Sequence, residues 1–456
     1  MFGGYTDTQW AALAFVFLGI ALVLATLVRR YTGFLRTLYI PVSVIAGFLI
    51  LLLGPQVLGA LTHSSGLVPV PVADVLARLP GLMINVVFAG VMLGKRLPSV
   101  RTFWRESAPH FILGSVFSFG QFALGALAVA LLLKPFFGLP DAAGSVLELS
   151  FAGGHGTIAG MGDILKTAGA PEVVDIGLGL ATISMITGVV GGSILVNYAI
   201  RSPRIAVART ARVHPATDAE HYIPPNSGDT DSADVGLGSI SRSFGAIALA
   251  IALGLLILEL LRFGTNALGS GLFDDFPLFP FTVIGGFVVQ LVVSLTGKEE
   301  LVERRTVNDI TTLALDILIA AAIGTMSLAA LGANIPSLVI LTVIAFAWSV
   351  VGMLWLGPRI HPVDWFEHAI ADYGQSQGNV ATGFVLADMA DPASATAAAR
   401  AYGYKQLTYE PILGGGVLTA LSVPIILQIG SLWFGVASLV VTAGLILWGT
   451  LRGRRS

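Results

Sequence analysis

Long apolar runs separated by short polar segments form the dominant pattern along the chain. Several of these runs exceed about 18 residues with almost no charged side chain, which is typical of transmembrane helices. The pattern predicts an all-α polytopic membrane protein with about eleven transmembrane helices. The predicted spans are 9–28, 38–60, 80–94, 108–133, 173–200, 244–263, 278–296, 309–331, 337–356, 407–429 and 432–450.

Two further segments, 143–165 and 364–391, are partly apolar but are interrupted by glycines and polar residues. Each glycine destabilises a helix by about 1 kcal/mol relative to alanine, while the missing Cβ lets backbone groups approach a ligand closely. Irregular backbone at membrane depth is tolerated only where it is buried in protein or lines a water-filled cavity. We therefore predict two re-entrant hairpins, each of which enters the membrane and leaves on the same side.

The turns of these hairpins hold the candidate substrate-binding residues. The first turn reads FAGGHGT and the second reads YGQSQGNVAT. A structural interpretation stays open for the first turn, in which the histidine holds the turn, the threonine caps a half-helix and the glycines allow close packing. The many amide and hydroxyl side chains of the second turn favour a binding role. The candidates are Gly153, Gly154, His155, Gly156, Thr157, Gln375, Ser376, Gln377, Gly378, Asn379 and Thr382.

A single acid, Asp316, lies well inside a predicted span. A carboxylate inside the membrane is energetically costly and indicates a functional site. We consider Asp316 a candidate for ion coupling, with pairing to a basic residue of a neighbouring helix as the alternative. No buried Lys or Arg is evident, so the positive ends of half-helices and a bound cation are expected to neutralise an anionic ligand.

Composition and charge narrow the class of protein. Only 11% of the residues are charged, and the mean hydropathy of +0.83 is far above that of soluble domains. The net charge of −2 gives no basis for a nucleic-acid partner, and the lack of cysteine excludes disulfides and thiol chemistry. Alternate loops contain 21 of the 25 Lys and Arg residues. The positive-inside rule then predicts an external N-terminus and a cytoplasmic C-terminus in a plasma (bacterial inner) membrane.

The chain repeats itself around a polar, proline-containing segment, 201–242, which we interpret as a flexible cytoplasmic linker. PVSVIAGF at 41–48 is echoed by PFTVIGGF at 280–287, and HGTIA at 155–159 by QGNVA at 377–381. An odd number of spans between the repeat starts inverts the second copy, as in secondary transporters. The predicted domains are an N-terminal repeat at 1–200, the linker at 201–242, an inverted repeat at 243–430 and an extra helix with a basic tail at 431–456.

Two patterns that occur in enzymes favour other interpretations here. GQSQG at 374–378 matches the nucleophile elbow of serine hydrolases, yet no α/β sheet is predicted around it. HPVDWFEH groups two histidines and two acids as in a zinc site, but we interpret it as an amphipathic, interfacial entry to the second hairpin. These four residues are His361, Asp364, Glu367 and His368. We therefore predict no enzyme activity and no cofactor. The inverted repeats favour a transporter that couples its substrate to an ion, with a channel or an antiporter as the alternative.

Five other motifs of the chain resemble those of the bacterial glutamate:sodium symporter family. The resemblance rests on SFAGGHGT at 150–157, AT at 181–182, GVVGG at 188–192, IPVSV at 40–44 and VATGFVLADMADP at 380–392. It implies two inverted halves with a re-entrant loop in each, and sodium-driven uptake of glutamate by alternating access. The implied partners are a small glutamate-like anion, sodium as the co-transported ion and the lipid bilayer, with a homodimer as one possible assembly.

Two departures from the family pattern concern the substrate. Val42 follows the proline of IP where family members have an acid, and the second loop, YGQSQGN, has fewer glycines and no histidine. The last span, 432–450, is an addition to the family pattern and is framed by Trp433 and Trp448 as interfacial anchors. A sodium- or proton-coupled carrier of di- or tricarboxylates, of the hydroxycarboxylate type, is therefore the alternative function.

Overall fold

The computed structural model describes residues 5–38, 40–64, 66–95, 100–202, 205, 237–269, 273–274, 276–392 and 395–454. All regular structure in these residues is helical, which confirms the predicted all-α fold. The chain divides into two compact units, and each unit combines segments from both halves of the sequence. Unit 1 comprises Met1–Lys95, His155–Leu178 and Asp234–Ala333, and unit 2 comprises Arg96–Gly154, Gly179–Ala233 and Asn334–Ser456.

The predicted linker, 201–242, lies largely outside the described residues. Its end is described as helix rather than linker, because α13 spans Leu237–Ala267. Ser239 explains why the helix extends beyond its apolar run: its hydroxyl lies 3.2 Å from the hydroxyl of Thr306 and also bonds to the carboxylate of Glu303. Polar contacts thus extend the helix at its N-terminus, beyond the start that hydrophobicity alone predicts.

Unit 1 consists mainly of long apolar helices. The first of them begins at a capping box, in which the side chains of Thr6 and Gln9 each accept a hydrogen bond from the other residue's backbone N–H. The described helices of the unit are α1 (Asp7–Tyr31), α2 (Gly33–Thr37), α3 (Val42–Leu53), η1 (Pro55–Gly59), α4 (Ala60–Thr62), α5 (Val70–Leu76), α6 (Leu79–Gly90), α11 (Gly162–Thr167), α13 (Leu237–Ala267), α14 (Phe279–Leu295), η5 (Glu299–Leu301), α15 (Arg304–Thr325) and α16 (Leu328–Ala333). Two more helices, α10 (Gly154–Gly160) and α12 (Glu172–Arg201), run across the boundary between the units.

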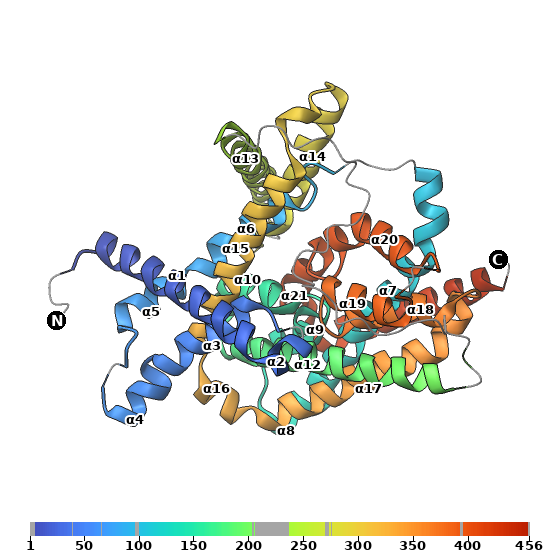
Figure 1. Ribbon diagram of the computed structural model, residues 1–456, viewed down its shortest axis with the longest axis horizontal. Helices are drawn as coiled ribbons and strands as arrows, with labels where there is room; N and C mark the ends of the chain where they lie inside the picture. Colours follow the sequence, from blue (N-terminus) through green and yellow to red (C-terminus); the bar gives the residue numbers. More distant parts are fainter. Residues whose placement is uncertain are drawn as a thin grey trace. The chain divides into compact units, whose positions relative to one another are not determined.

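Helix contacts in unit 1 follow the order α1, α3, α15, α6, α14, α13 (Figure 1). Each N-terminal helix can be exchanged with a counterpart beyond the linker: α1 with α13, α3 with α14, and α6 with α15. The exchange gives the same order of contacts, read from the opposite end. A duplicated unit produces such exchange symmetry, because equivalent surfaces then meet equivalent partners. The inversion of the second copy stays a prediction.

Glycines bring the helices α3 and α15 of unit 1 close together. A Cβ on Gly47 would lie 2.6 Å from the Cβ of Ile323, and a Cβ on Gly324 would lie 2.7 Å from the Cγ2 of Ile50. In each helix, the bare backbone at a glycine therefore packs against a branched side chain of the other helix. This is the small-residue packing that holds helices together where the surroundings are as apolar as the side chains.

Unit 2 is organised around α7, against which α17, α18, α20 and α21 all pack. A Cβ on Gly120 of α7 would overlap the ring of Trp348, at 2.1 Å from Cζ2, and a Cβ on Gly352 of α17 would lie 2.6 Å from Cε1 of Phe117. Aromatic rings thus fill the glycine positions of the facing helix. The helices of the unit are α7 (Val100–Ala128), η2 (Val129–Leu133), α8 (Lys134–Phe137), η3 (Asp141–Ser145), α9 (Val146–Phe151), α17 (Ile335–Ile360), α18 (Trp365–Ser376), α19 (Val380–Ala390), α20 (Ala398–Ile412) and α21 (Val417–Gly453).

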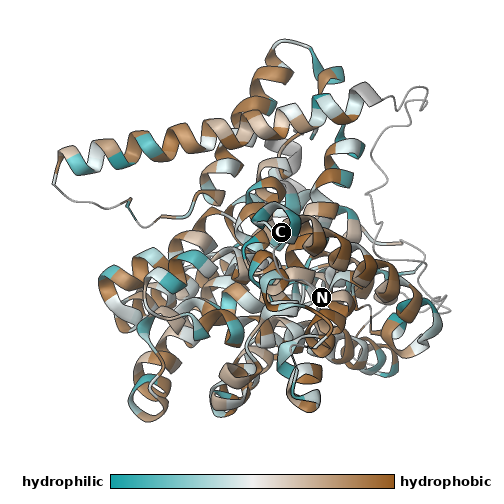
Figure 2. Ribbon diagram, turned by 90° about the vertical axis from the view of Figure 1, so that its left-hand side faces the viewer, coloured by the Kyte–Doolittle hydropathy of each residue, from teal (hydrophilic) through white to brown (hydrophobic). Residues whose placement is uncertain are grey.

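Nine segments among the described residues are long and apolar enough to cross a membrane. The count reaches the predicted eleven when α14, with 17 residues, is added and when Ala398–Gly453 is divided at Gly430, where the backbone of α21 is not helical. Figure 2 shows hydrophobic residues along most of the helical surface. Together these features are those of a multi-pass membrane protein.

The predicted span 407–429 is wrong as a single helix. α20 ends at Ile412 and α21 begins at Val417. Between them lie three consecutive glycines at 414–416, two of which have positive φ angles. Glycine is the residue that adopts this backbone conformation without steric cost, so the apolar run continues while the helix does not.

Two other predicted spans have different ends. The span 80–94 ends at Gly90 and is extended at its start by α5, and the span 309–331 ends at Thr325. Asp175 accounts for the end at Thr325, because its carboxylate accepts a hydrogen bond from the backbone N–H of Ser327 at 2.7 Å. That bond satisfies a backbone donor outside the helix and stabilises the break before α16.

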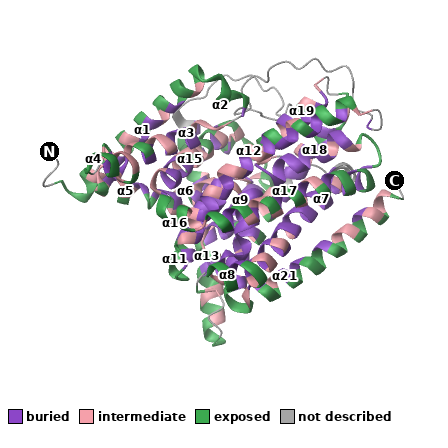
Figure 3. Cartoon of the chain, turned by 90° about the horizontal axis from the view of Figure 1, so that it is seen from below, coloured by how far each residue is buried: buried purple, intermediate pink, exposed green. Residues whose placement is uncertain are grey.

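Both segments that we predicted to be hairpins are broken helices. The segment 143–165 contains α9, α10 and α11 in succession, and the segment 364–391 contains α18 and α19. α18 is buried along most of its length, from Phe366 to Ser376 (Figure 3). Packing within unit 2 therefore covers the polar residues of this helix as well, and the interfacial position of HPVDWFEH, at 361–368, stays a prediction. The re-entrant path of each segment stays a prediction.

Candidate functional site

The second broken segment leaves three residues, 377–379, between α18 and α19. Asn379 caps α19, because its Oδ1 accepts hydrogen bonds from the backbone N–H of Thr382 at 2.9 Å and from the hydroxyl of Thr382 at 3.2 Å. The C-terminal carbonyls of α18 and the N-terminal N–H groups of α19 therefore meet at one break. A helix end of the first kind attracts cations and an end of the second kind attracts anions.

The first broken segment comes to the same place within unit 2. Gly154 has a φ of +76°, and a Cβ on it would lie 3.8 Å from the carbonyl oxygen of Gly378. A Cβ on Gly414, whose φ is +62°, would lie 3.6 Å from Nε2 of Gln375 and 3.7 Å from the carbonyl oxygen of Ala152. We call this meeting point the break site and define it by Ala152–Gly154, Gln375–Asn379 and Gly414.

The glycines of α12 in unit 2 pack against the second broken segment. A Cβ on Gly188 would lie 2.7 Å from the carbonyl oxygen of Gln377, and a Cβ on Gly192 would lie 2.3 Å from Cδ1 of Leu386. The GVVGG motif therefore provides the room that α18 and α19 need. Each glycine cluster lies against the broken segment of the other sequence half, since Gly414 contacts the first and Gly188 the second.

Gln377 is held inside the protein. Its Nε2 donates hydrogen bonds to the hydroxyl of Ser349 at 2.8 Å and to the carbonyl oxygen of Ala345 at 3.0 Å, both on α17. The neighbouring Ser376 donates to the carbonyl oxygen of Tyr373 at 2.9 Å. These two side chains fix the position of the break rather than extend from it.

Gln375 is also engaged, in a polar network with α20. Its amide pairs reciprocally with the amide of Gln406, at 2.9 and 3.0 Å, and its Oε1 accepts from the ammonium group of Lys405 at 2.7 Å. Asn379 differs from these amides. It is only partly buried, and its Nδ2 has no hydrogen bond in the part of the chain that the structure describes. Asn379 is thus the candidate amide that retains a donor at the break.

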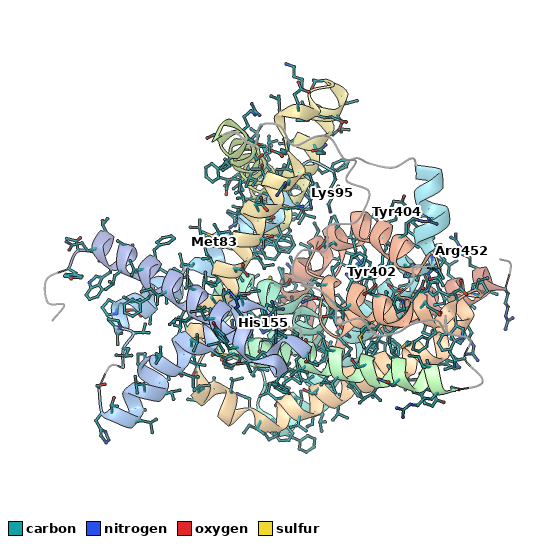
Figure 4. The ribbon with its side chains drawn as sticks, viewed as in Figure 1. Met83, Lys95, His155, Tyr402, Tyr404 and Arg452 are labelled. Carbon is teal, nitrogen blue, oxygen red and sulfur yellow. The ribbon has the colours of Figure 1, made fainter. Side chains whose placement is uncertain are left out.

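The remaining candidates belong to unit 1 and begin at His155, which is labelled in Figure 4. His155 and Thr157 are buried. A Cβ on Gly156 would lie 3.1 Å from Cδ1 of Leu315, the neighbour of Asp316 on α15. The structure therefore places α10 against the helix that carries the candidate coupling acid, and Asp316 itself is half-buried.

Glu148 on α9 is a buried acid that the sequence analysis did not single out. It is fully inaccessible to solvent, and Oε1 accepts a hydrogen bond from the hydroxyl of Thr419 at 3.0 Å. Its Oε2 has no hydrogen-bond partner among the described residues, and the same holds for Oε1 of Gln121 on α7. The signal in the sequence was an acid between two leucines, directly before the glycine turn.

A buried ion pair connects α18 to α20. The ammonium group of Lys405 lies 2.8 Å from Oδ1 of Asp372 and is covered by the rings of Tyr409, at 4.0 Å, and Tyr402, at 5.3 Å, the latter labelled in Figure 4. The expectation that no basic residue lies inside the protein is therefore wrong. The sequence signal was a lysine with tyrosines three residues before and four after it, which places all three on one helix face.

Histidines surround the other oxygen of Asp372. Oδ2 lies 2.8 Å from Nδ1 of His110 on α7 and 3.6 Å from Nε2 of His361. Nε2 of His110 lies 2.8 Å from Nδ1 of His368. Two members of the HPVDWFEH group thus come together, with a third histidine that is remote in sequence. The acids of that group, Asp364 and Glu367, do not belong to this cluster.

The hydrolase-like pattern GQSQG has a different structural context from a nucleophile elbow. It spans the C-terminal end of α18 and the break behind it, and not a strand-to-helix turn. Its serine donates to a backbone carbonyl of its own helix. His368, the upstream histidine, contacts His110 instead.

Comparison with known families decides the class of the protein. The sodium/glutamate symporter family matches residues 9–356, which is more than half of the chain. The chain belongs to the sodium/glutamate symporter family. No individual curated protein matches it.

Membership makes this symporter a multi-pass membrane transporter, and confirms the resemblance found in the motifs. The matched region covers α1 to α17 and includes the first broken segment. It ends before α18, so the second broken segment, with its unusual loop YGQSQGN, lies outside the match. Transport in the family is coupled to sodium, and the family is one of transporters rather than enzymes.

A separate cavity of about 330 Å³ opens in unit 1 between α6, α11 and α14. Asp163, Arg262 and Asp274 line it. The guanidinium group of Arg262 is already bonded to Glu259 and to the backbone carbonyls of Phe273, Asp274 and Phe276, so it is not free to bind an anion. The break site of the symporter is therefore the stronger candidate for substrate.

Proposed function

We propose that this symporter carries glutamate or a related carboxylate together with sodium, and that both bind at the break site. The observation that carries the proposal is the meeting of two chain breaks, at Gly154 and at 377–379, where a Cβ on Gly154 would lie 3.8 Å from the carbonyl oxygen of Gly378. Discontinuous helices from the two sequence halves are the elements that bind substrate and ions in secondary transporters.

The N-terminal end of α19 supports an anionic substrate. Its backbone N–H groups and the helix dipole favour negative charge, and the free Nδ2 donor of Asn379 stands beside them. Lys405 adds positive charge near the break, but Asp372 and Gln375 already bind its ammonium group. In our proposal the substrate carboxylate therefore binds to α19 and Asn379, and Lys405 contributes through Gln375.

Glu148 supports a cation at the same site. A buried carboxylate with one unbonded oxygen is costly unless a positive charge compensates it. Hard cations prefer oxygen ligands, and the unbonded oxygens of Glu148 and Gln121 are of that kind. We propose that sodium binds to the carboxylate of Glu148, and we keep Asp316 as the candidate acid of unit 1.

Alternating access follows from the same proposal. The exchange symmetry of helix contacts in unit 1 and the crossed packing of the glycine clusters in unit 2 support a duplicated, inverted unit. Two such halves can form one site that opens to each side in turn. Coupling to more than one sodium ion then drives an anion into a cell that is negative inside, since each charge moved is worth about 2.3 kcal/mol per 100 mV.

Uptake of radiolabelled amino acids and dicarboxylates into proteoliposomes, with and without a sodium gradient, tests the proposal. We expect glutamate or a similar dicarboxylate to accumulate only with the gradient, and substrate binding to be weaker in choline than in sodium. Equal binding in both salts would falsify sodium coupling.

A proton-coupled carrier of hydroxycarboxylates is the second candidate, because the match to the family ends before the second broken segment. Uptake of citrate- or malate-like acids driven by a pH gradient, and stopped by Asp316→Asn, would favour it over the glutamate symporter. Flux that neither saturates nor follows any ion gradient would identify a channel instead.

A further inference from the structure

We propose that unit 2 contains a binding site for a divalent transition metal ion of the zinc class, formed by His110, His361 and His368. The three histidines come from α7, from the connection after α17 and from α18. One ring nitrogen of each lies within 4.8 Å of the others. This site is separate from the proposed sodium site and does not depend on the transported substrate.

The spacing of the rings fits a metal. Tetrahedral zinc with Zn–N bonds of about 2.0–2.1 Å places its nitrogen ligands roughly 3.3 Å apart. Nε2 of His110 lies 2.8 Å from Nδ1 of His368, and one ring nitrogen of each histidine lies within 4.8 Å of the others, so the spacing of the nitrogens is comparable with that of ligands around one ion.

Asp372 orients one of the ligands. Its Oδ2 accepts a hydrogen bond from Nδ1 of His110 at 2.8 Å, which places the proton on Nδ1 and leaves the lone pair of Nε2 facing His368. A carboxylate that binds the remote nitrogen of a histidine is the usual support of a histidine metal ligand. Lys405 holds the other oxygen of Asp372, so the carboxylate is fixed from both sides.

His361 provides an independent indication of a ligand. Its side chain is only 3% exposed, and its Nε2 has no hydrogen-bond partner among the described residues, since Asp372 Oδ2 is too far away at 3.6 Å. Buried polar nitrogens are almost always bonded. A metal ion bound to Nε2 would supply the missing partner.

Charge and access are compatible with a dication. Asp372 lies between the histidines and Lys405 and neutralises the ammonium group. His368 is only partly buried, and in our proposal a water molecule is the fourth ligand. Imidazole ligands select transition metals over Mg²⁺ and Ca²⁺, which prefer oxygen.

The test uses the full chain purified in detergent, with any histidine tag removed. Because the protein contains no cysteine and only seven histidines, metal binding reports on few side chains. Titration with Zn²⁺ against a chromophoric chelator should give one ion per chain, and Co²⁺ should give the absorption bands of a low-symmetry, imidazole-bound ion. Mg²⁺ at the same concentration should not compete.

Variants assign the ligands. His361→Gln and His368→Gln should each weaken Zn²⁺ binding by at least the roughly 10–100-fold that loss of a supporting residue costs. His63→Ala is the matched control, because His63 is exposed and lies outside the cluster, and it should bind as the wild type does.

Wild-type protein that binds no stoichiometric Zn²⁺ would overturn the proposal. So would a Zn²⁺ affinity that is the same in His361→Gln, His368→Gln and His63→Ala. If a glutamine variant does not fold, the wild-type stoichiometry and the Co²⁺ spectrum decide by themselves.

Discussion

Lys405 illustrates how single residues connect the two clusters of unit 2. Its ammonium group binds Asp372 at 2.8 Å and Gln375 at 2.7 Å, and so joins the histidine cluster to the break site. Removing one partner of a buried ion pair leaves an uncompensated charge, which costs more than the pair itself contributes. Asp372, Gln375 and Lys405 are therefore expected to behave as one unit in mutagenesis, with effects that are not additive.

At the same scale, Asn379→Ser tests the free amide donor. Serine caps a helix as well as asparagine does, so the stability of α19 should change by only a few tenths of a kcal/mol. Loss of the Nδ2 donor should raise the substrate concentration for half-maximal uptake about ten-fold, since an unpaired polar group costs about 1–3 kcal/mol. Uptake kinetics and thermal unfolding measure the two effects separately.

Gln377→Ala is the matched comparison for that variant. Gln377 bonds to Ala345 and Ser349, so its truncation should lower the free energy of unfolding by about 1–3 kcal/mol. An unchanged half-saturation concentration in Asn379→Ser would exclude the amide from substrate binding.

Glu148→Gln tests the proposed cation site. The glutamine has the same shape and can keep the bond to Thr419, but it lacks the charge that binds sodium. Sodium should raise the melting temperature of the wild type above its value in choline, because a ligand that binds only the folded state stabilises it. That difference should disappear in Glu148→Gln and persist in Asp316→Asn. The reverse result would move the coupling site to Asp316.

Among the elements, α21 is unusual because it contains a residue that is not helical. Gly430 has φ 80° and ψ 157° inside a helix that otherwise continues from Val417 to Gly453. Essentially only glycine adopts this region of backbone space. Ser431, the next residue, bonds to the carboxylate of Asp141 at 2.5 Å, so the kink is also held by η3.

Gly430→Ala should therefore destabilise the protein by about 1–3 kcal/mol, although a Cβ there meets no atom within 4 Å. Gly444→Ala is the control in the same helix, since Gly444 is equally open but helical. That change should be neutral or stabilising by up to about 1 kcal/mol. Thermal unfolding in detergent compares the two variants, and equal melting temperatures would mean that the kink carries no strain.

At the scale of the whole molecule, many large hydrophobic side chains of the described helices are exposed. This arrangement reverses that of a soluble protein and fits a chain surrounded by lipid. The succession of helix contacts in unit 1 and the glycine packing in unit 2 both connect elements of one sequence half to elements of the other. Each unit is therefore built from both halves of the sequence.

Topology is the prediction that belongs to this scale. Because the protein has no native cysteine, Thr6→Cys and Ser456→Cys report the sides of the two ends without background. Because the loops that hold most basic residues are predicted to be cytoplasmic, Thr6→Cys should react with a membrane-impermeant thiol reagent on intact cells, and Ser456→Cys only after permeabilisation. Reaction of both cysteines from the same side would exclude an odd number of spans.

The sequence by itself determined the class of the protein and the position of its breaks. Apolar runs of membrane length, together with glycines and amides at 153–157 and 375–382, are local properties that the chain carries whatever its partners are. Because such local properties set the limits of an apolar run, the break at Gly430 coincides with the gap between two predicted spans. It also explains the failure at 407–429, where hydrophobicity continued through three glycines that end the helix.

Only the tertiary structure decided which polar groups meet. His110 lies more than 250 residues from His361 and His368, and Lys405, which precedes the predicted span 407–429, is buried by the packing of α20 against α7 and α18. Glu148 and Thr419 are likewise remote in sequence. Periodicity describes the face of one helix, whereas the partner of a buried charge depends on how several helices pack together. The break site could therefore be located from the sequence, and its charges could not.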